Sequence, residues 1–444
     1  MDIVAKESRA SQPGQAGQSN QSKQSGQPGE SGQPARTPDC VLCGCCLEGC
    51  PLLALTGREE LSPRAKALLA GPSRFNPVNL PEGGLREADV AALTGLCLAC
   101  GRCEKLCPQG VKVPALMAAL RAAHPDFRQW LWKQWVTKLT PFWSLASHGA
   151  AALPEAFAPA SLGLALKGLK GLRPGKGLAP WLTITEFPVQ AYRQKHGDRA
   201  VAVFDGCVGS GPRGVWADTA RHLLRGLGVT PVAARFSCCG STLGTAGLPQ
   251  EQAQARRANV AAWRGAGRPM LVTYCATCRK GLWEYASAGS GLFVDADEAT
   301  QWRAALVPLS ALLLGAAATA GQGAPAVVGY HRPCHADLGD GLGDPDFALL
   351  SGLLSAQPHT QLRTPAKGGC CGFGGILQLA APQLSEGVGR ACWPTLDASL
   401  DFTSAPEAAP AYVLTGCSGC VMQLSATAPE NARVGHWLEI VRTA

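Results

Sequence analysis

Two cysteine runs near the N-terminus constrain the fold more than any other feature. Residues 40–51 read CVLCGCCLEGCP and residues 97–108 read CLACGRCEKLCP, so both contain the spacing C-x2-C-x2-C-x3-C-P. When the runs are aligned, Cys45 falls on Arg102 and is the surplus cysteine. This spacing wraps three thiolates around one face of a [4Fe–4S] cube, and the proline turns the chain away.

Each run predicts ligands for two clusters, because in two-cluster ferredoxins the fourth cysteine of a run binds the other cluster. We therefore expect one cluster on Cys40, Cys43, Cys46 and Cys107, and the other on Cys97, Cys100, Cys103 and Cys50. Structural zinc is the alternative, but zinc sites use two separated cysteine pairs, whereas each motif here has its four cysteines in one continuous run. The runs favour iron and sulfur.

Length and composition describe a globular protein with several domains. The chain has 444 residues, of which 46% are apolar and 16% charged, and we expect two to four domains. The net charge of +8 is spread thinly, without the basic stripe that nucleic-acid binding requires. The N-terminal residues lack an apolar export signal, so the twenty cysteines are expected to serve as metal ligands or redox groups in the cytoplasm.

Two apolar stretches raise the question of a membrane. Residues 304–321 carry no charge, but Pro308 and the many alanines favour a buried helix running into a loop over a spanning helix. The tryptophan-rich stretch 127–143 also contains Arg128, Lys133 and Lys138. It could form an amphipathic surface against a membrane or a partner, and packing on the chain's own domains is slightly favoured.

The rest of the chain divides by composition. Residues 1–38 form a Gln/Ser/Gly/Pro tract that predicts a disordered tail. We expect a ferredoxin-like domain at 39–125 and a helical connector at 126–198 that includes the Gly/Lys linker LKGLKGLRPGKG. Two cysteine-rich domains are expected at 199–320 and 325–444.

These last two domains are an internal duplication. VAVFDGCVGS (201–210) parallels VVGYHRPCHA (327–336), FSCCGSTLGTAG (236–247) parallels GGCCGFGGIL (368–377), and LVTYCATC (271–278) parallels YVLTGCSGC (412–420). Strand patterns alternate with helical ones, such as the helix ending at Gly228 whose buried face carries Trp216, Ala220, Leu223 and Leu227. We therefore expect an α+β or α/β protein, in which a helical two-cluster ferredoxin-like domain precedes two duplicated small α/β domains.

Each half contributes five cysteines near the carboxyl ends of its strands, where such sheets place their sites. The first cysteine set is Cys207, Cys238, Cys239, Cys275 and Cys278, and the second cysteine set is Cys334, Cys370, Cys371, Cys417 and Cys420. Adjacent cysteines followed by glycine let two thiolates converge. The gap from Cys371 to Cys417 is longer than that from Cys239 to Cys275, so the second site can differ from the first.

Several other residues have two interpretations. His331 and His335 flank Cys334 and could donate a hydrogen bond to a cluster sulfur, although satisfied loop histidines are the commoner case. His436 is expected to be a packing residue and Cys392 a buried small side chain.

The paired motifs carry a family resemblance. CCGSTLGTAG and CCGFGG, each with an upstream cysteine and a downstream C-x-x-C, resemble the CCG domains of heterodisulfide reductase and of the iron–sulfur subunits of glycolate, lactate and anaerobic glycerol-3-phosphate dehydrogenases. The resemblance covers residues 38–444. GREELSPRAK (57–66) and VGHWLEIV (434–441) resemble the glycolate oxidase iron–sulfur subunit most. Both cysteine sets are complete, and in heterodisulfide reductase a complete set binds a noncubane [4Fe–4S] cluster that cleaves a disulfide.

The resemblance implies an electron-transfer subunit of a flavin-dependent glycolate or D-lactate dehydrogenase. It implies two [4Fe–4S] clusters, permits one or two further clusters on the CCG cysteines, and implies an FAD-containing partner subunit. Electrons would pass to a quinone or another carrier, with the chain cytoplasmic or peripheral on the inner face of the membrane. No catalytic residue for the hydroxy acid and no dinucleotide fingerprint are found. A heterodisulfide-reductase-type subunit that reduces a disulfide is the alternative.

Overall fold

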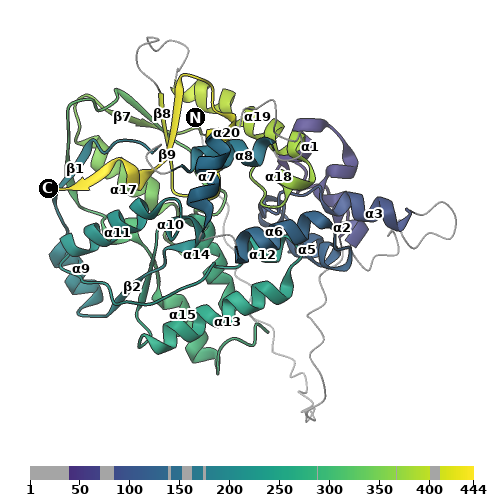
Figure 1. The fold of residues 1–444 in the computed structure, drawn as a ribbon, viewed down its shortest axis with the longest axis horizontal. Coiled ribbons are helices and arrows are strands. Elements are labelled where there is room, and N and C mark those ends of the chain that lie inside the picture. The colour runs from purple at the N-terminus through teal and green to yellow at the C-terminus, as the bar shows by residue number, and fades with distance from the viewer. Residues whose placement is uncertain are drawn as a thin grey trace, which may run out of the picture. The chain divides into compact units, whose positions relative to one another are not determined.

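Three small sheets with helices packed around them form most of this computed structural model (Figure 1). The structure describes residues 40–70, 85–138, 142–152, 163–173, 177–287, 289–366, 368–400 and 411–444. The tail predicted at 1–38 lies outside the described residues. Residues 37–444 form one unit, and the description below concerns that unit alone.

The two cysteine runs lie among short helices at the right of Figure 1. These are α1 (Pro51–Thr56), η1 (Glu59–Leu61), α2 (Pro63–Ala70), α3 (Glu87–Thr94), α4 (Arg102–Lys105) and α5 (Val113–Ala123). Helix α1 begins at Pro51, whose fixed φ suits a first helical turn, and is followed by the left-handed Gly57. Ala67 of α2 and Met117 of α5 pack with Cys97 and Cys103 in one buried cluster. The helices therefore hold the cysteine loops in place.

A helical segment connects this part to the sheets. It contains α6 (Phe127–Thr137), α7 (Trp143–Ala152), α8 (Gly163–Gly171) and α9 (Val189–His196), with strand β1 (Leu182–Glu186) before α9. The predicted linker at 166–177 is wrong in its first half, which belongs to α8. A Cβ atom on Gly171 would lie 2.8 Å from the Ser425 Cβ of helix α20 (Ser418–Thr427). The glycines therefore allow close helix packing rather than a flexible connection.

The first half forms a parallel sheet in the order β2-β3-β4. Its elements are β2 (Val201–Val203), α10 (Gly206–Gly209), α11 (Gly214–Gly226), α12 (Ser241–Thr245), α13 (Pro249–Gly265), β3 (Met270–Thr273), α14 (Ala276–Trp283), η5 (Glu284–Ala286), α15 (Ala296–Ala305) and β4 (Leu306–Pro308). The predicted α11 is confirmed: Trp216, Ala220, Leu223 and Leu227 are buried, and Gly228 follows with a φ of +80°.

The second half forms a parallel sheet in the order β7-β6-β8-β9. Its elements are β6 (Val327–Tyr330), α17 (Pro345–Ser355), β7 (Gln361–Arg363), α18 (Leu377–Ala380), α19 (Pro382–Leu400), β8 (Ala411–Thr415), α20, β9 (Ala432–His436) and η6 (Trp437–Glu439). The strand–loop–helix pattern of the first half recurs, as the duplicated motifs predict.

A third sheet was not foreseen. Strand β1 pairs in parallel with β10 (Val441–Thr443) and antiparallel with β5 (Ala317–Ala320). The apolar stretch 304–321 supplies the end of α15, then β4, α16 (Leu309–Leu312) and β5, so the expected single helix is wrong. Pro308 cannot continue a helix and Gly315 has a φ of +89°. Within the described ranges, no helix is long and apolar enough to cross a membrane.

One hydrophobic core spans both halves. It includes Trp216 and Val272 from the first half and Val328, Leu350 and Trp437 from the second, each at most 1% exposed. Burial of such side chains stabilises the fold by about 1.5–3 kcal/mol each. The two halves therefore form one block, and their cysteine-bearing loops are held in a fixed relation.

Candidate metal centres

The two N-terminal runs adopt the same local backbone. Leu42 and Ala99 occupy equivalent positions and both have a left-handed φ, 60° and 50°, which is uncommon for residues other than glycine. Gly44 and Gly101, again equivalent, have φ values of 82° and 75°. These turns flank Cys43 and Cys100. The two runs therefore share one local backbone conformation around these cysteines.

Cys107 lies with the first run, although it belongs to the second. Burial raises the pKa of Cys46, and nearby Cys40, Cys107 and Cys43 raise it further. The backbone N–H of Val111 donates to Cys107 Sγ at 3.4 Å. Cys40, Cys43, Cys46 and Cys107 are called the Cys107 group below.

Cys50 lies with the second run in the same crossed manner. Cys50, Cys97, Cys100 and Cys103, called the Cys50 group below, together line a cavity of about 20 Å³. Burial raises the pKa of Cys103, and Cys97, Cys100 and Cys50 add to the rise. Four buried or half-buried thiols around one small space are a donor set that suits a soft metal centre.

Cys45 lies at the surface beside Cys43. The backbone N–H of Cys45 and then its thiol lower the pKa of Cys43, while the hydrogen bond with Cys43 raises that of Cys45. Cys45 and Cys43 are both exposed. Arg102, the aligned residue of the second run, instead donates to the Gly369 carbonyl at 2.6 Å.

The first cysteine set forms one row of buried and half-buried thiols. Hydrogen bonds between side chains join Cys207 to Cys238, Cys238 to Cys239, Cys239 to Cys278, and Cys278 to Cys275. Accepting from Cys207 and Cys239 lowers the pKa of Cys238 well below its usual value. The backbone N–H of Gly240 also donates to Cys238 Sγ at 3.4 Å. Hydrogen bonds that lower the pKa values of Cys238 and Cys275 therefore favour the thiolate, the form that binds metals, whereas the pKa values of Cys207, Cys239 and Cys278 are raised.

The second cysteine set continues the row. Side-chain hydrogen bonds join Cys371 to Cys420 and Cys420 to Cys417, and Cys417 in turn contacts Cys275 of the first half. The hydrogen bond to Cys275 is the main reason that the pKa of Cys417 rises to about 12. The row of thiols thus crosses from one half to the other.

The glycine that follows each adjacent cysteine pair is required by the backbone. Gly240 and Gly372 have φ values of 74° and 84°. A Cβ atom at Gly372 would lie 2.4 Å from the Ser385 carbonyl oxygen. Only glycine fits both the torsion and the space, and this explains the third letter of the Cys-Cys-Gly motif.

The second cysteine set also reaches the Cys50 group. The charge of a Cys100 thiolate raises the pKa values of Cys334 and Cys370, whose main cause of rise is burial. Cys50 and Leu98 pack with Cys370 and Leu377. Lys105 Nζ donates to the Asp337 carbonyl at 3.0 Å. The spatial order is therefore the Cys107 group, the Cys50 group, the second set and the first set.

The two histidines beside Cys334 differ in the direction of their pKa shifts and in what their rings contact. Burial alone would lower the pKa of His331, but hydrogen bonds to Cys371 and Cys392 raise it to about 9. Burial lowers the pKa of His335 to about 3, and its Nδ1 lies 3.3 Å from Thr277 Oγ1. His331 therefore contacts the second set directly, whereas His335 reaches Cys417 only through the Thr277 hydroxyl, 3.1 Å from that sulfur.

His436 and Cys392 are both buried. His436 is fully buried and accepts from the backbone N–H of Leu438 at 3.2 Å, so the packing assignment is confirmed. Cys392 is buried as expected, but its sulfur lies 3.7 Å from His331 Nδ1. Sequence spacing gave no signal for that contact, because it joins α19 to the loop after β6.

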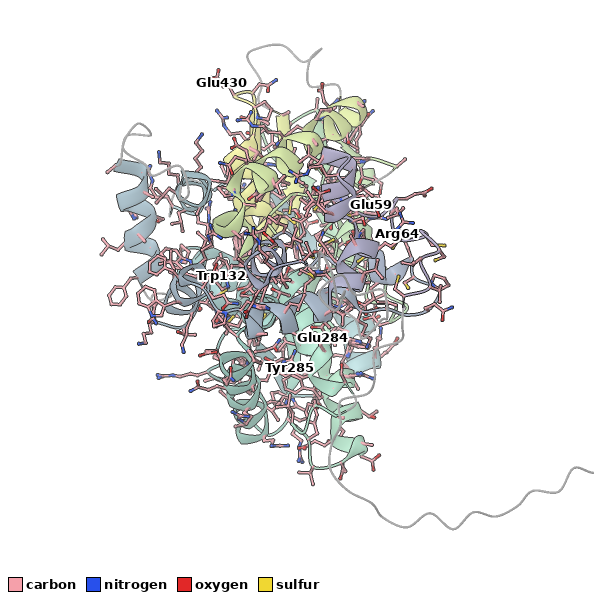
Figure 2. The ribbon with its side chains drawn as sticks, turned by 90° about the vertical axis from the view of Figure 1, so that its right-hand side faces the viewer. Glu59, Arg64, Trp132, Glu284, Tyr285 and Glu430 are labelled. Carbon is pink, nitrogen blue, oxygen red and sulfur yellow. The ribbon has the colours of Figure 1, made fainter. Side chains whose placement is uncertain are left out.

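An apolar cavity of about 220 Å³ adjoins the first cysteine set. Trp132, Trp135 and Trp143 line it, and so do Cys207 and Cys239. Figure 2 marks Trp132 on its helix α6. The same stretch exposes Phe127, Trp130 and Phe142 at 70%, 53% and 58%, so the tryptophan-rich segment packs inward with one face and meets solvent with the other.

The donor sets fit iron–sulfur clusters. All twenty cysteines lie in the described residues and none forms a disulfide. Soft thiolates select soft centres such as iron–sulfur clusters or zinc. The 4Fe-4S dicluster domain family matches residues 37–111, which contain both runs. The cysteine-rich CCG domain family matches residues 201–282 and 328–425, one match in each half.

Curated relatives extend these matches over most of the chain. The "Probable glycolate oxidase iron-sulfur subunit" of Bacillus subtilis is 24% identical over 87% of this chain and 88% of its own length. The "Glycolate oxidase iron-sulfur subunit" of Escherichia coli is 26% identical over 91% of this chain and 93% of its own length.

Another relative belongs to a different enzyme. It is a dihydromethanophenazine:CoB–CoM heterodisulfide reductase subunit of Methanosarcina mazei, 24% identical over 79% of this chain and 81% of its own length. No solved structure matches the chain. The dicluster domain, the two cysteine-rich domains and these relatives agree with the arrangement of the thiols. This chain therefore carries a 4Fe-4S dicluster domain followed by two cysteine-rich CCG domains, and over most of its length it is similar to iron–sulfur subunits of glycolate oxidase and to a heterodisulfide reductase subunit.

Proposed function

We propose that this chain is the electron-transfer subunit of a flavin-dependent 2-hydroxy-acid dehydrogenase that oxidises glycolate or D-lactate. The observation that carries the proposal is a series of neighbouring thiol groups that runs from the Cys107 group to the Cys50 group, then through the second cysteine set to the first. A chain of closely spaced centres suits the movement of single electrons. The two relatives named as glycolate oxidase subunits support the substrate class.

In this proposal the Cys107 group and the Cys50 group each hold one [4Fe–4S] cluster. The first and second cysteine sets hold one further iron–sulfur centre each. Such clusters, when bound, accept and release single electrons. The protein's part is to supply the thiolates, to exclude water from the two buried sets and to fix their spacing through the shared core.

A partner must supply the hydride chemistry. Removing hydrogen from a hydroxy acid needs a hydride acceptor, and a flavin normally converts between hydride and single electrons. The sequence holds no dinucleotide fingerprint, so we assign the flavin to a separate FAD-containing subunit.

The apolar cavity supports a lipid-soluble quinone as the electron acceptor. A cavity of about 150 Å³ is enough to bind benzene in a protein core, so a cavity of about 220 Å³ accommodates a substituted quinone ring. Within the described residues, the buried indole N–H of Trp132 has no hydrogen-bond partner, and a quinone carbonyl would accept from it. Reduction to the quinol would take two electrons, one at a time from the iron–sulfur centre that the first cysteine set would hold, and two protons from solvent.

The helices α6 and α7, which line the cavity, would also let a quinone reach it from a membrane. Phe127, Trp130 and Leu145 are exposed, and the first two share helix α6 with the basic Arg128 and Lys133. Aromatic and basic residues together are typical of peripheral contact with an anionic membrane. We infer that α6 and α7 lie against the inner face of the cytoplasmic membrane.

Dye reduction tests the proposal. The chain and the flavoprotein recovered with it from the native host should together reduce an artificial dye when glycolate or D-lactate is added, and neither should do so alone. Activity of this chain alone toward the hydroxy acid would contradict the assignment of the flavin to a partner.

Disulfide reduction is the second candidate. Its support is the contact between Cys275 and Cys417, which brings two complete cysteine sets together, and the relatives named as heterodisulfide reductase subunits. Recovery of a thiol-handling partner, with turnover of a disulfide and none of a hydroxy acid, would favour it.

A further inference from the structure

The duplication allows each residue of one half to be compared with its counterpart in the other. When Cys207 is aligned with Cys334, Phe204 falls on His331. When Cys239 is aligned with Cys371, Val260 falls on Cys392. All four side chains are buried, at 1% for Phe204 and Val260, 3% for His331 and 2% for Cys392. The second half thus replaces an apolar pair with two groups that can bind a metal.

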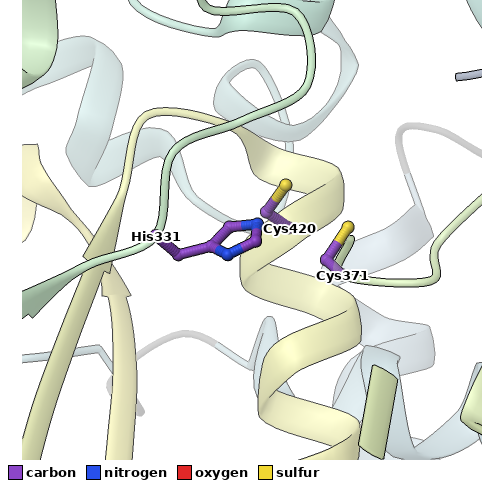
Figure 3. A group of neighbouring side chains, drawn as sticks. All are labelled: His331, Cys371 and Cys420. Atoms are coloured by element: carbon purple, nitrogen blue, oxygen red, sulfur yellow. The ribbon is translucent and has the colours of Figure 1, made fainter. Parts of the chain in front are cut away.

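These groups lie at the second cysteine set. A ring nitrogen of His331 and the sulfurs of Cys371 and Cys420 lie within 4.8 Å of one another, and all three side chains are buried. Figure 3 shows the imidazole between the loop after β6 and helix α20, beside both cysteines. The backbone N–H of His331 donates to the Leu414 carbonyl at 2.8 Å, so the ring is anchored to the sheet.

The first half has an apolar ring at the equivalent place. There Cys239 and Cys278 hydrogen-bond to each other, and Phe204 packs against Phe236 with ring centroids 5.5 Å apart. The two halves therefore share a fold, but at these matched positions the second half has side chains that can bind a metal and the first half has none.

We propose that His331 is a ligand of the iron–sulfur centre in the second half, which gives that centre mixed nitrogen and sulfur coordination while the first-half centre is bound by thiolates alone. The inference rests on the proposed iron–sulfur role of the CCG cysteines. Ligating histidines usually donate their second ring N–H to a nearby group. Cys392 Sγ, 3.7 Å from Nδ1, is that group, so Nε2 binds the iron.

Mixed ligation bears on the reduction potential of the second-half centre. The imidazole stands where the first half has Phe204 and adds a neutral donor, whereas a thiolate at the same position would add negative charge. Histidine ligation gives Rieske centres a higher reduction potential than thiolate ligation does. The second-half centre therefore has a higher potential with His331 than it would have with a cysteine at that position.

Nitrogen hyperfine spectroscopy tests the ligand without any need for turnover. The full chain, purified anaerobically and labelled with 15N-histidine, is reduced, and pulsed EPR is recorded on each centre. We expect a strongly coupled histidine nitrogen on one CCG centre, with its frequency shifted by the label. Absence of a label-sensitive coupling on every centre would overturn the proposal, and this measurement requires no substitution.

Substitutions then show which histidine gives rise to the nitrogen coupling. His331→Phe, which installs the first-half residue, should abolish it, and His331→Cys should abolish it while keeping the iron and lowering the potential of that centre. His335→Asn is the matched control and should leave the coupling unchanged. Loss of the coupling in His335→Asn but not in His331→Phe would contradict the assignment.

Iron content separates failure of this inference from failure of the proposed function. If Cys371→Ser removed no iron from the chain, the second set would hold no iron centre and the electron-transfer proposal itself would lose its second-half site. If Cys371→Ser removed iron but no histidine coupling existed, only the ligation by His331 would be wrong.

Discussion

The thiols of Cys275 and Cys417, which belong to the two halves of an internal repeat, are joined by a hydrogen bond in the buried core. Each follows the carboxyl end of a central strand, β3 or β8, and each precedes the first residue of a helix, α14 or α20. Because the core is shared between the halves, this contact is held by many surrounding side chains. It places the two cysteine sets next to each other, at the end of the series that begins in the dicluster domain.

The two adjacent cysteines of the first run should differ in importance. Cys45→Ser should leave the iron content and the reduced EPR spectrum unchanged, because Cys45 is exposed and outside the Cys107 group. Cys46→Ser should remove or convert one cubane, a loss of up to about four iron atoms per chain. The reverse result would show that the two runs are aligned incorrectly.

Filling the apolar cavity should block the quinone and leave the clusters intact. Ala165 lines the cavity, so Ala165→Phe should lower the apparent affinity for a short-chain quinone by tenfold or more, about 1.4 kcal/mol. Quenching of tryptophan fluorescence by the quinone measures this affinity. Dye reduction at the clusters should not change.

Matched substitutions make the cavity test specific. Ala152→Phe, at an exposed position of α7, should bind quinone like the wild type. Trp132→Phe should weaken binding because it removes the unpaired indole donor, whereas the exposed Trp130→Phe should not. Equal effects in each pair would show that the quinone binds elsewhere.

Gly372→Ala should be strongly destabilising. Its φ of 84° costs a non-glycine residue about 1–2 kcal/mol, and the added Cβ would meet backbone atoms of Ser385 and Gly389 at 2.4 and 2.7 Å. Gly267 has a φ of 79° but no atom within 4 Å of a Cβ, so Gly267→Ala should cost only the torsional energy, about 1–2 kcal/mol. Denaturant unfolding measures both, and similar costs would contradict the packing of the Cys-Cys-Gly turn.

Asp346 should make stability depend on pH. Burial raises the pKa of its carboxyl to about 8, so between about pH 4 and pH 8 the folded chain keeps a proton that the unfolded chain releases. Stability from this group is therefore complete below about pH 4 and is lost as the pH rises toward 8. Asp346→Asn removes this dependence.

The measurement compares unfolding free energies of the two proteins across that range. The free energy of unfolding of the Asn variant should rise relative to that of the wild type by a few kcal/mol between pH 4 and pH 8. Above pH 8 the difference should level off. A difference that stayed constant across the range would mean that the folded carboxyl titrates like the unfolded one.

Local patterns predicted much of this structure. Periodicity predicted α11 and its end at Gly228, and the duplicated motifs predicted two small α/β domains with cysteines after their strands. The pairing of Leu182 with Val441 in the third sheet was missed, because strands this short carry almost no pattern and their partners are distant in sequence. Gly168 and Gly171 were interpreted as linker residues, since glycine signals either flexibility or close packing until its neighbour is known.

The candidate site, like the fold, was predictable from the sequence only in part. The cysteines could be named from spacing, because metal ligation imposes fixed intervals along the chain. The contact of His331 with Cys392 and the lining of the cavity by Trp132 and Cys239 depend on tertiary packing, and no interval in the sequence encodes them.

Metal analysis of the anaerobically purified full chain, combined with Mössbauer spectroscopy, tests the central claim most directly. The account predicts about eight iron atoms in two cubane clusters, and additional iron with a distinct spectrum that Cys371→Ser or Cys239→Ser reduces. Zinc in place of iron, or full retention of the spectrum when both CCG cysteines are replaced, would contradict it.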